Sequence, residues 1–368
     1  MQTILAMHMA NELLSPPVAA ATLALGAVAV AAASLRAGKT LSVDRAPLMG
    51  VMGAFVFAAQ MINFTLPLMP GTSGHLGGGV LLAILLGPAA GIVTMAAILI
   101  VQCLLFQDGG LLALGCNILN MGVVPCLLGW GTYRLLLGPV ARAKAARQYL
   151  AAWVACTLGV AGGAAMVPVQ AYASGVLRID PVDFLLVMVG VHLLIGLVEG
   201  AITFAVLAYL RRVRPAALGL AAPPDRAGAP GWGTVLASLG ASAVLVAGVV
   251  SWFASTHPDG LEWTYREHFT RDGAAAVANP SPLVAAADRL QSKWTPLSDY
   301  TRRSAPLGQE PAAVKEEPAL PAAWPNVSGW GSLAGVVGTG VTLVVLFAAG
   351  WALRRRRANQ EAAGPRAA

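Results

Sequence analysis

The chain of 368 residues is 57% hydrophobic and 11% charged, and its formal net charge is +7. Soluble domains average about 25% charged residues, so this composition argues against a soluble globular protein. The arginines cluster at the ends of apolar runs and form no basic stripe with interleaved aromatic residues, so we expect no nucleic-acid partner. Apolar runs of about 20 residues recur, which predicts an all-α fold, a polytopic helix bundle in the lipid bilayer.

The first part of the chain contains about seven predicted transmembrane helices. They occupy residues 13–35, 47–62, 76–87, 88–106, 111–137, 149–172 and 184–210. The third and fourth helices are separated at Gly87-Pro88, because proline removes a backbone donor and clashes with the preceding turn. Basic residues follow the first, fifth and seventh helices, at Arg36, Arg142 and Arg211. Positive residues beside helix ends mark the cytoplasmic side, so the N-terminus is predicted to lie outside.

The rest of the chain divides into a linker, a two-helix module and a basic tail. They occupy residues 215–231, 232–353 and 354–368. The linker is rich in Ala, Pro and Gly, and we expect it in the cytoplasm. The module encloses a polar external stretch, 257–325, whose low hydrophobicity predicts that part of it is flexible. The arginine run that opens the tail predicts a cytoplasmic C-terminus.

Two of the five histidines lie where an external loop meets an apolar helix. His8 stands near the chain start, and His75 stands in the glycine-rich run 71–79. Imidazole is the commonest protein ligand for late first-row divalent metals. If the chain starts at Met7, its amine, a backbone amide and the His8 imidazole can chelate a planar ion such as Ni(II) or Cu(II), with His75 as a further donor. An interfacial histidine on a frayed terminus and glycines that serve helix packing are the alternatives.

Several polar residues lie in or beside the apolar segments, where such groups usually face a bundle interior. The candidates for a supporting role around the metal are Asn63, Ser73, Asn117 and Asn120, and the other buried polar candidates are Gln60, His192 and Glu199. Asn117 and Asn120 share a helix face and are predicted to hydrogen-bond the loop that carries His75. Hydrogen bonds between helices are the alternative for this pair. Asp108 is interpreted as a solvated loop carboxylate outside the site.

The sequence contains no P-loop, no HExxH motif and no GxSxG motif. We therefore expect no enzyme and no catalytic cofactor, and uphill movement of a metal would draw on a partner or an ion gradient. The alternatives are a membrane-embedded metalloenzyme and a structural or assembly protein that uses its histidines only for packing.

A set of motifs resembles the substrate-capture component of energy-coupling factor (ECF) cobalt/nickel transporters, the CbiM/NikM family. The motifs are Met7-His8-Met9, Leu14-Ser15-Pro16-Pro17, Gln60-Met61-Ile62-Asn63-Phe64, Gly71-Thr72-Ser73-Gly74-His75-Leu76-Gly77-Gly78, Asp108-Gly109-Gly110-Leu111-Leu112-Ala113-Leu114-Gly115, Asn117-Ile118-Leu119-Asn120-Met121-Gly122 and 192–200. The likeness covers residues 7–214. Residues 1–6 precede the start typical of the family, and we expect that Met7 is the true start.

The two-helix module is similar to the small companion subunit of the same transporters. Pro258, Asp259, Gly260, Leu261 and Glu262 reproduce the PDGLE signature of that subunit. The chain thus resembles a capture subunit fused to its companion.

The resemblance implies that Met7, His8 and His75 bind Ni2+ or Co2+ as the transported substrate, with a preference for Ni2+. It implies a location in the cell (inner) membrane. It also implies two kinds of partner, a transmembrane coupling subunit and two cytoplasmic ATPase subunits that drive release inward.

Overall fold

The computed structural model describes residues 8–42, 45–66, 68–139, 144–220, 231–269, 277–278, 280–301, 306–309 and 324–362. The fold is all-α, and the described strands are the short antiparallel pair β1 (Phe64–Thr65) and β2 (Ser73–Gly74). The predicted all-α membrane fold is confirmed. Part of the predicted linker, 221–230, lies outside the described residues.

All nine predicted apolar segments contain helix. Their helices are α1 (Pro16–Thr40), α2 (Arg45–Gln60), α3 (Gly79–Leu86), α4 (Pro88–Val101), α5 (Leu114–Asn117) with α6 (Trp130–Leu137), α7 (Ala145–Ala173), α8 (Pro181–Val213), α9 (Trp232–Gly248) and α12 (Gly329–Ala362). A π-helical turn, Gln102–Phe106, extends α4, and two more, Ile118–Val123 and Pro125–Gly129, join α5 to α6. Six described helical spans are long and apolar enough to cross a membrane, whereas α2, α3 and α9 are shorter.

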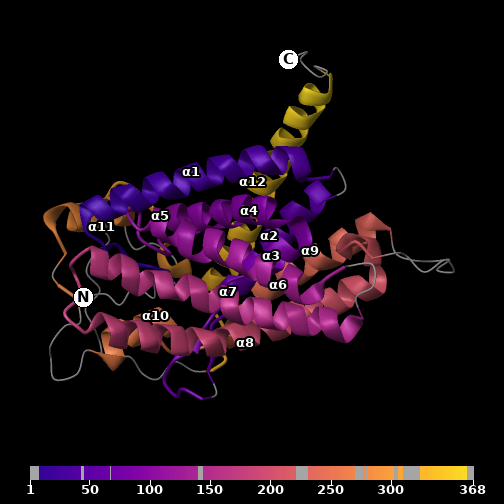
Figure 1. Cartoon of the computed structure of the whole chain (residues 1–368). Helices are drawn as coiled ribbons and strands as arrows, with labels where there is room; N and C mark the ends of the chain where they lie inside the picture. The colour runs from indigo at the N-terminus through magenta and orange to yellow at the C-terminus, as the bar shows by residue number, and fades with distance from the viewer. Residues whose placement is uncertain are drawn as a thin grey trace, which may run out of the picture.

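The centre of the bundle is formed by α3 and α4, which are buried on nearly all sides (Figure 1). A helix that is apolar all round belongs in such an interior. The break between them was predicted correctly: α3 ends at Leu86, α4 begins at Pro88, and Gly87 between them has φ +88°. Glycine adopts this positive φ without steric cost.

The C-terminal module packs into the first part of the chain. Helix α12 lies against α2, and α9 contacts both. Helices α12 and α2 approach closely because glycine stands at the contact. A Cβ at Gly338 of α12 would lie 2.2 Å from Phe57 Cζ, and a Cβ at Gly53 of α2 would lie 2.0 Å from a methyl group of Leu346. Small residues let membrane helices approach in this way.

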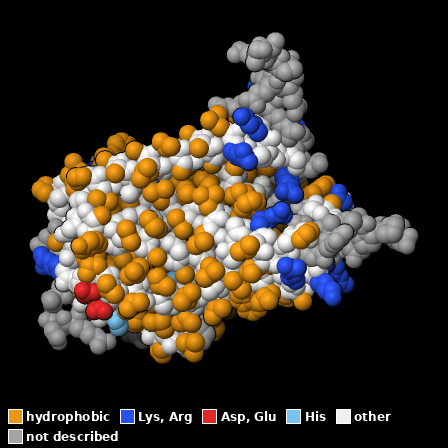
Figure 2. All heavy atoms as spheres, viewed as in Figure 1, with side chains coloured by type: hydrophobic (Ala, Val, Ile, Leu, Met, Phe, Trp, Pro, Cys, Tyr) orange, Lys and Arg blue, Asp and Glu red, His pale blue; other side chains and the backbone are white. Residues whose placement is uncertain are grey.

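The polar stretch between α9 and α12 covers one end of the bundle. Its described helices are α10 (Gly260–Glu262), the π-helical turn Trp263–His268, α11 (Pro282–Trp294) and a short turn, Ser298–Tyr300. Figure 1 shows α10 and α11 at the same end as the N-terminus of the chain. Basic side chains gather at the opposite end, while the view in Figure 2 is otherwise dominated by hydrophobic side chains.

Polar contacts hold the described residues of this stretch on the bundle, and the flexibility expected for part of the stretch stays a prediction. Asn11 Nδ2 donates to Asp288 Oδ1 at 2.5 Å, and the Gln291 side chain bonds the backbone of both Gly109 and Leu111. Arg266 joins Glu12 of the first part to Glu262 of its own module, with N–O distances of 3.0 and 3.2 Å. These described helices are therefore docked on the bundle.

Candidate metal-binding site

His8 opens a short buried segment that is fixed beside α5. The Met9 backbone nitrogen donates to Asn117 Oδ1 at 2.9 Å, and Asn117 Nδ2 donates back to the Met9 carbonyl at 3.2 Å. Gly110 donates its backbone N–H to the same Met9 carbonyl. The His8 side chain is thereby held at the end of the bundle with 2% of the residue exposed.

The two ring nitrogens of His8 have different environments. Nδ1 lies 2.5 Å from Asp108 Oδ1. An ionised carboxylate only accepts hydrogen bonds, so Nδ1 carries the proton. Nε2 is buried and has no hydrogen-bond partner among the described residues. In the neutral imidazole Nε2 then carries a lone pair, which is the arrangement of a metal-binding histidine whose other nitrogen is oriented by a carboxylate.

His75 follows β2, and its position is fixed by hydrogen bonds to the backbone of the residues that come next, Gly77 and Gly78. Glu199 Oε2 accepts from Gly77 N at 2.7 Å, and Glu199 Oε1 accepts from Gly78 N at 3.2 Å. Gly78 has φ +78°, a conformation that lets the chain turn sharply into α3. Gln60 Nε2 donates to the Gly77 carbonyl at 2.8 Å, and Gln102 donates to Gln60. Glu199 and Gln60 therefore fix the loop that presents His75.

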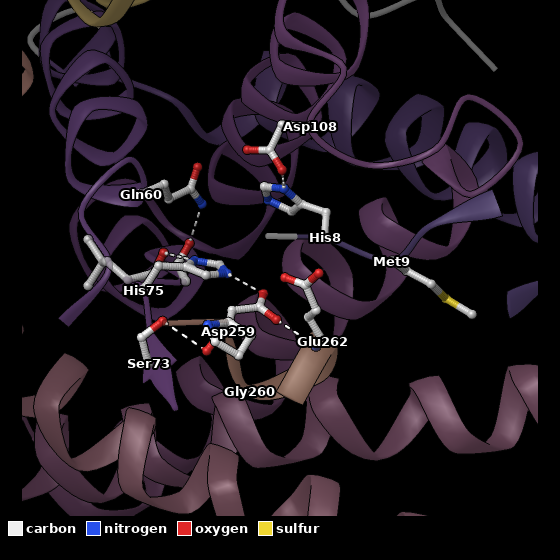
Figure 3. A network of polar contacts seen from close by, with 12 residues as sticks. His8, Met9, Gln60, Ser73, His75, Asp108, Asp259, Gly260 and Glu262 are labelled. Carbon is white, nitrogen blue, oxygen red and sulfur yellow. Dashed lines mark hydrogen bonds and ion pairs between the residues drawn. The ribbon is translucent and has the colours of Figure 1, made fainter. Parts of the chain in front are cut away.

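The two histidines meet, with ring centroids 5.6 Å apart. They line one cavity of about 80 Å³ at the junction of the N-terminal segment, the His75 loop, α7 and α8. Figure 3 shows the His8 and His75 rings close together beneath Asp108 and above Asp259. Of the predicted supporting residues, Asn117 and Asn120 line the cavity and Asn63 and Ser73 do not. Of the other buried polar candidates, His192 and Glu199 line it and Gln60 does not.

The PDGLE-like run closes the cavity from the side of the C-terminal module. Ser73 N donates to the Pro258 carbonyl at 2.8 Å, and Ser73 Oγ donates to the His257 carbonyl at 2.8 Å. Asp259 Oδ1 caps α10 by accepting from Glu262 N at 2.7 Å. Its other oxygen, Oδ2, lies 3.8 Å from His75 Nε2. Gly260 packs on α8, where a Cβ would lie 2.7 Å from Val191 Cγ1.

Asp108 corrects the interpretation made from sequence, because it is buried and belongs to the site. It is 4% exposed, and Tyr300 of the C-terminal module donates to its Oδ2 at 2.8 Å. Burial alone would raise the pKa of Asp108, but the nearby His8 and the hydrogen bonds from His8 and Tyr300 bring that pKa below its usual value. Asp108 is therefore ionised at neutral pH and orients His8.

Replacing Asp108 by Asn should weaken metal binding without removing a metal donor. The amide keeps the shape but loses the charge that fixes the proton on Nδ1, and loss of such an orienting partner typically costs about 10–100-fold in affinity. The measurement is Ni(II) titration of the purified chain. Asp183→Asn, a change of an exposed carboxylate at the start of α8, is the control and should leave the affinity unchanged. Equal affinities for the parent and Asp108→Asn would contradict this role.

The other polar residues predicted from the sequence form hydrogen bonds with partners outside the His75 loop. Asn117 bonds the Met9 backbone and Asn120 pairs with Gln170 of α7, with 2.8 Å for both Asn120–Gln170 bonds, so the predicted bonds of this pair to the His75 loop are wrong. His192 Nδ1 bonds the Met188 carbonyl one turn earlier. The Asn63 carbonyl accepts from Ser255 N, which joins the loop after α2 to the segment that follows α9.

The described part of the metal site consists of side chains from His8, His75 and their neighbours. Met7, the predicted amine donor, lies outside the described residues. Within the described ranges, no group of three or more His, Cys, Asp and Glu side chains is already arranged to hold an ion. The site as it stands is therefore a pair of imidazoles with flanking carboxylates, open to completion by further donors.

Comparison with known proteins decides the family. Residues 8–217 match the family model CbiM, described as the cobalt uptake substrate-specific transmembrane region. The chain belongs to the CbiM family. Residues 233–355 match the PDGLE domain. The protein is thus a membrane component of cobalt or nickel transport fused to a PDGLE part, and the family is one of transporters rather than enzymes.

The names of two relatives, given first, agree with this assignment. The fused nickel transport protein NikMN of Rhodobacter capsulatus is 29% identical over 325 residues, which cover 82% of this chain and 91% of the relative. A protein of Haloquadratum walsbyi, provisionally named a metal transport protein, is 38% identical over 212 residues, covering 57% of this chain and 92% of the relative. A crystal structure titled as a transition metal transporter is similar at 28% identity and a TM-score of 0.45, covering 56% of this chain and 93% of that one.

Proposed function

We propose that this CbiM-family chain is the substrate-binding membrane component of an ECF-type importer that captures Ni2+ or Co2+ outside the cell, with Ni2+ preferred. The observation that carries the proposal is the pairing of His8 and His75, from distant parts of the sequence, across one buried cavity. The unpartnered Nε2 of His8 supports it, because a buried lone pair without a hydrogen bond is costly unless a ligand occupies it. Met7 is proposed as a further nitrogen donor through its amine.

The proposed function implies a division of the chain into two functional parts joined by a linker. Residues 7–214 form the metal-capture domain, and a cytoplasmic linker, 215–231, leads to the PDGLE-type module, 232–353, and the basic tail. Residues 1–6 are proposed to precede the true start. The related Rhodobacter capsulatus protein is named a fused nickel transport protein, and this name supports a fused arrangement and the preference for nickel.

The proposed orientation puts the histidine pair outside and the C-terminus in the cytoplasm of a cell with the chain in its inner membrane. The charges support it, since the last turns of α1, α6 and α8 carry Lys or Arg and Arg354 and Arg355 lie in the C-terminal part of α12. Basic side chains gather at this end of the bundle in Figure 2. A transmembrane coupling subunit and two cytoplasmic ATPases would drive release inward. The described residues contain no nucleotide-binding motif of their own, so the driving partners are part of the proposal.

The test is the metal content of the full chain, expressed from Met7, purified in detergent and exposed to equal concentrations of Ni(II) and Co(II). Near-stoichiometric metal, mostly nickel, is the expected result. A second sample carrying His8→Ala and His75→Ala should retain the same elution volume and helical content but hold little metal. Folded parent protein without bound metal would refute capture at this site, and a full load of cobalt would refute the preference for nickel.

A further inference from the structure

The PDGLE-like run and the His75 loop share a small interface at the edge of the cavity. Residue Ser73 pairs with Asp259 as a parallel bridge, and the hydrogen bonds from Ser73 to the Pro258 and His257 carbonyls hold the two segments side by side. Because His75 lies two residues beyond Ser73, this pairing fixes the distance between the His75 ring and the Asp259 carboxylate. Both side chains line the same cavity, together with His8.

The spacing of the two donors is informative. His75 Nε2 and Asp259 Oδ2 lie 3.8 Å apart, which is too long for a hydrogen bond between nitrogen and oxygen. Bonds from a first-row divalent metal to imidazole nitrogen or carboxylate oxygen are about 2.0–2.2 Å long, so two donors on one ion lie at most about 4.4 Å apart. The observed gap is therefore short enough for both atoms to reach one ion placed between them.

Only one carboxylate oxygen of Asp259 has a structural role, which is to cap α10. Oδ1 caps α10, and the residue is 4% exposed, so the carboxylate is held without freedom to turn to solvent. Arg266, in the π-helical turn that follows the motif, pairs with Glu262 and Glu12 rather than with Asp259. A buried carboxylate oxygen directed at an imidazole, in a cavity with a second imidazole, is a donor set suited to a divalent ion.

We propose that Asp259 is a ligand of the captured metal, so that the C-terminal module supplies one donor of the site and His75 supplies its neighbour. The inference rests on the proposed function and deepens it. It makes Asp259 of the PDGLE-like run part of the metal-binding surface, with Tyr300 of the same module supporting His8 through Asp108. Capture of the metal and docking of the module on the bundle then stabilise each other, because the ion joins residues of both.

The first variant is Asp259→Asn, since asparagine keeps the helix cap and the size of the side chain while replacing the carboxylate by a weak donor. The expected result is a Ni(II) dissociation constant raised at least about 10-fold, with an unchanged melting temperature of the metal-free protein. Glu262→Gln is the matched control, because it removes the other carboxylate of the same run, which faces Arg266. It should shift the dissociation constant by less than about 2-fold, in line with a charge outside the ligand set.

A spectroscopic variant separates a ligand from a residue that merely supports the fold. Asp259→Cys places a thiolate where the carboxylate lies, and a bound Co(II) ion should then show a thiolate-to-metal charge-transfer band that the parent protein lacks. Glu262→Cys should show no such band. The four native cysteines are present in every sample and cancel in the comparison.

The measurements distinguish failure of Asp259 as a metal ligand from failure of metal capture by the histidine pair. If Asp259→Asn binds Ni(II) as tightly as the parent and Asp259→Cys gives no new band, Asp259 is not a ligand and the inference is overturned. In that case loss of binding in His75→Ala would still support metal capture by the histidine pair. Unchanged binding in His75→Ala would instead overturn the proposed function itself.

Discussion

Replacing His75 by Ala is expected to lower the affinity for Ni(II) at least about 100-fold. Loss of a residue that only orients a metal ligand typically costs about 10–100-fold in affinity, and this change removes a ligand itself. The expected loss corresponds to at least about 2.8 kcal/mol of binding free energy. The imidazole is held between the Asp259 carboxylate and the His8 ring, and the smaller side chain leaves neither a nitrogen nor a substitute in that place. Isothermal titration of the purified chain with Ni(II) measures the loss.

His257→Ala is the matched control for this change. His257 is exposed and lies in the segment beside Asp259, and its carbonyl, which accepts from Ser73, is kept in the variant. It should bind Ni(II) like the parent. If His75→Ala keeps the parental affinity, or if His257→Ala loses affinity to the same extent, the histidine pair is not the site.

Replacing Glu199 by Ala is expected to damage both the fold and the site. Glu199 is fully buried in α8, and its two oxygens accept from the backbone of Gly77 and Gly78. Alanine leaves two N–H groups without partners, and each buried unsatisfied group costs about 1–3 kcal/mol. The turn before α3 then loses its anchor, so the His75 ring is no longer fixed and Ni(II) affinity should fall about 10–100-fold.

Thr203→Val provides the comparison for Glu199→Ala. Thr203 lies one turn further along α8, is equally buried, and its Oγ1 contacts the thiol of Cys156. It should change the melting temperature of the metal-free protein far less than Glu199→Ala does, and leave Ni(II) affinity near the parental value. A Glu199→Ala protein with unchanged melting temperature and affinity would show that Glu199 does not anchor the loop.

The helices were predictable because each is a run of apolar residues bounded by proline, glycine or charge. The break at Gly87-Pro88 is a local steric fact, and it appears in the structure where it was expected. The π-helical turns between α5 and α6 were not predicted, because they depend on packing against α3, α4 and α7 rather than on local preference. The lengths of α2, α3 and α9, too short for a simple crossing, follow from the same tertiary context.

The contacts around the site were harder to predict than its histidines. Asp108 was interpreted as solvated because a lone loop carboxylate usually is, yet His8 and Tyr300 compensate its burial from positions 100 and 192 residues away. Such pairings carry no local signal. The motif Asp108-Gly109-Gly110, part of the family resemblance, was the one available hint. Asn117 supports the site through the Met9 backbone rather than through the His75 loop.

The planar chelate predicted from the sequence would require a change in the hydrogen bonding of His8. An imidazole that shares a metal with its own backbone amide uses Nδ1, the nitrogen nearer the backbone. In the structure Nδ1 of His8 is bonded to Asp108, while Nε2 is buried without a hydrogen-bond partner among the described residues. Formation of that chelate would therefore require His8 to leave Asp108, whereas binding through Nε2 would keep the pair intact.

The most direct test of the central claim, that both histidines bind the transported metal, is the X-ray absorption spectrum of the full chain loaded with Ni(II). The account predicts a shell of nitrogen and oxygen donors at about 2.0–2.1 Å with outer scattering from two imidazole rings. One ring should disappear in His8→Ala and one in His75→Ala. A loaded protein whose spectrum contains no imidazole scattering would contradict the account.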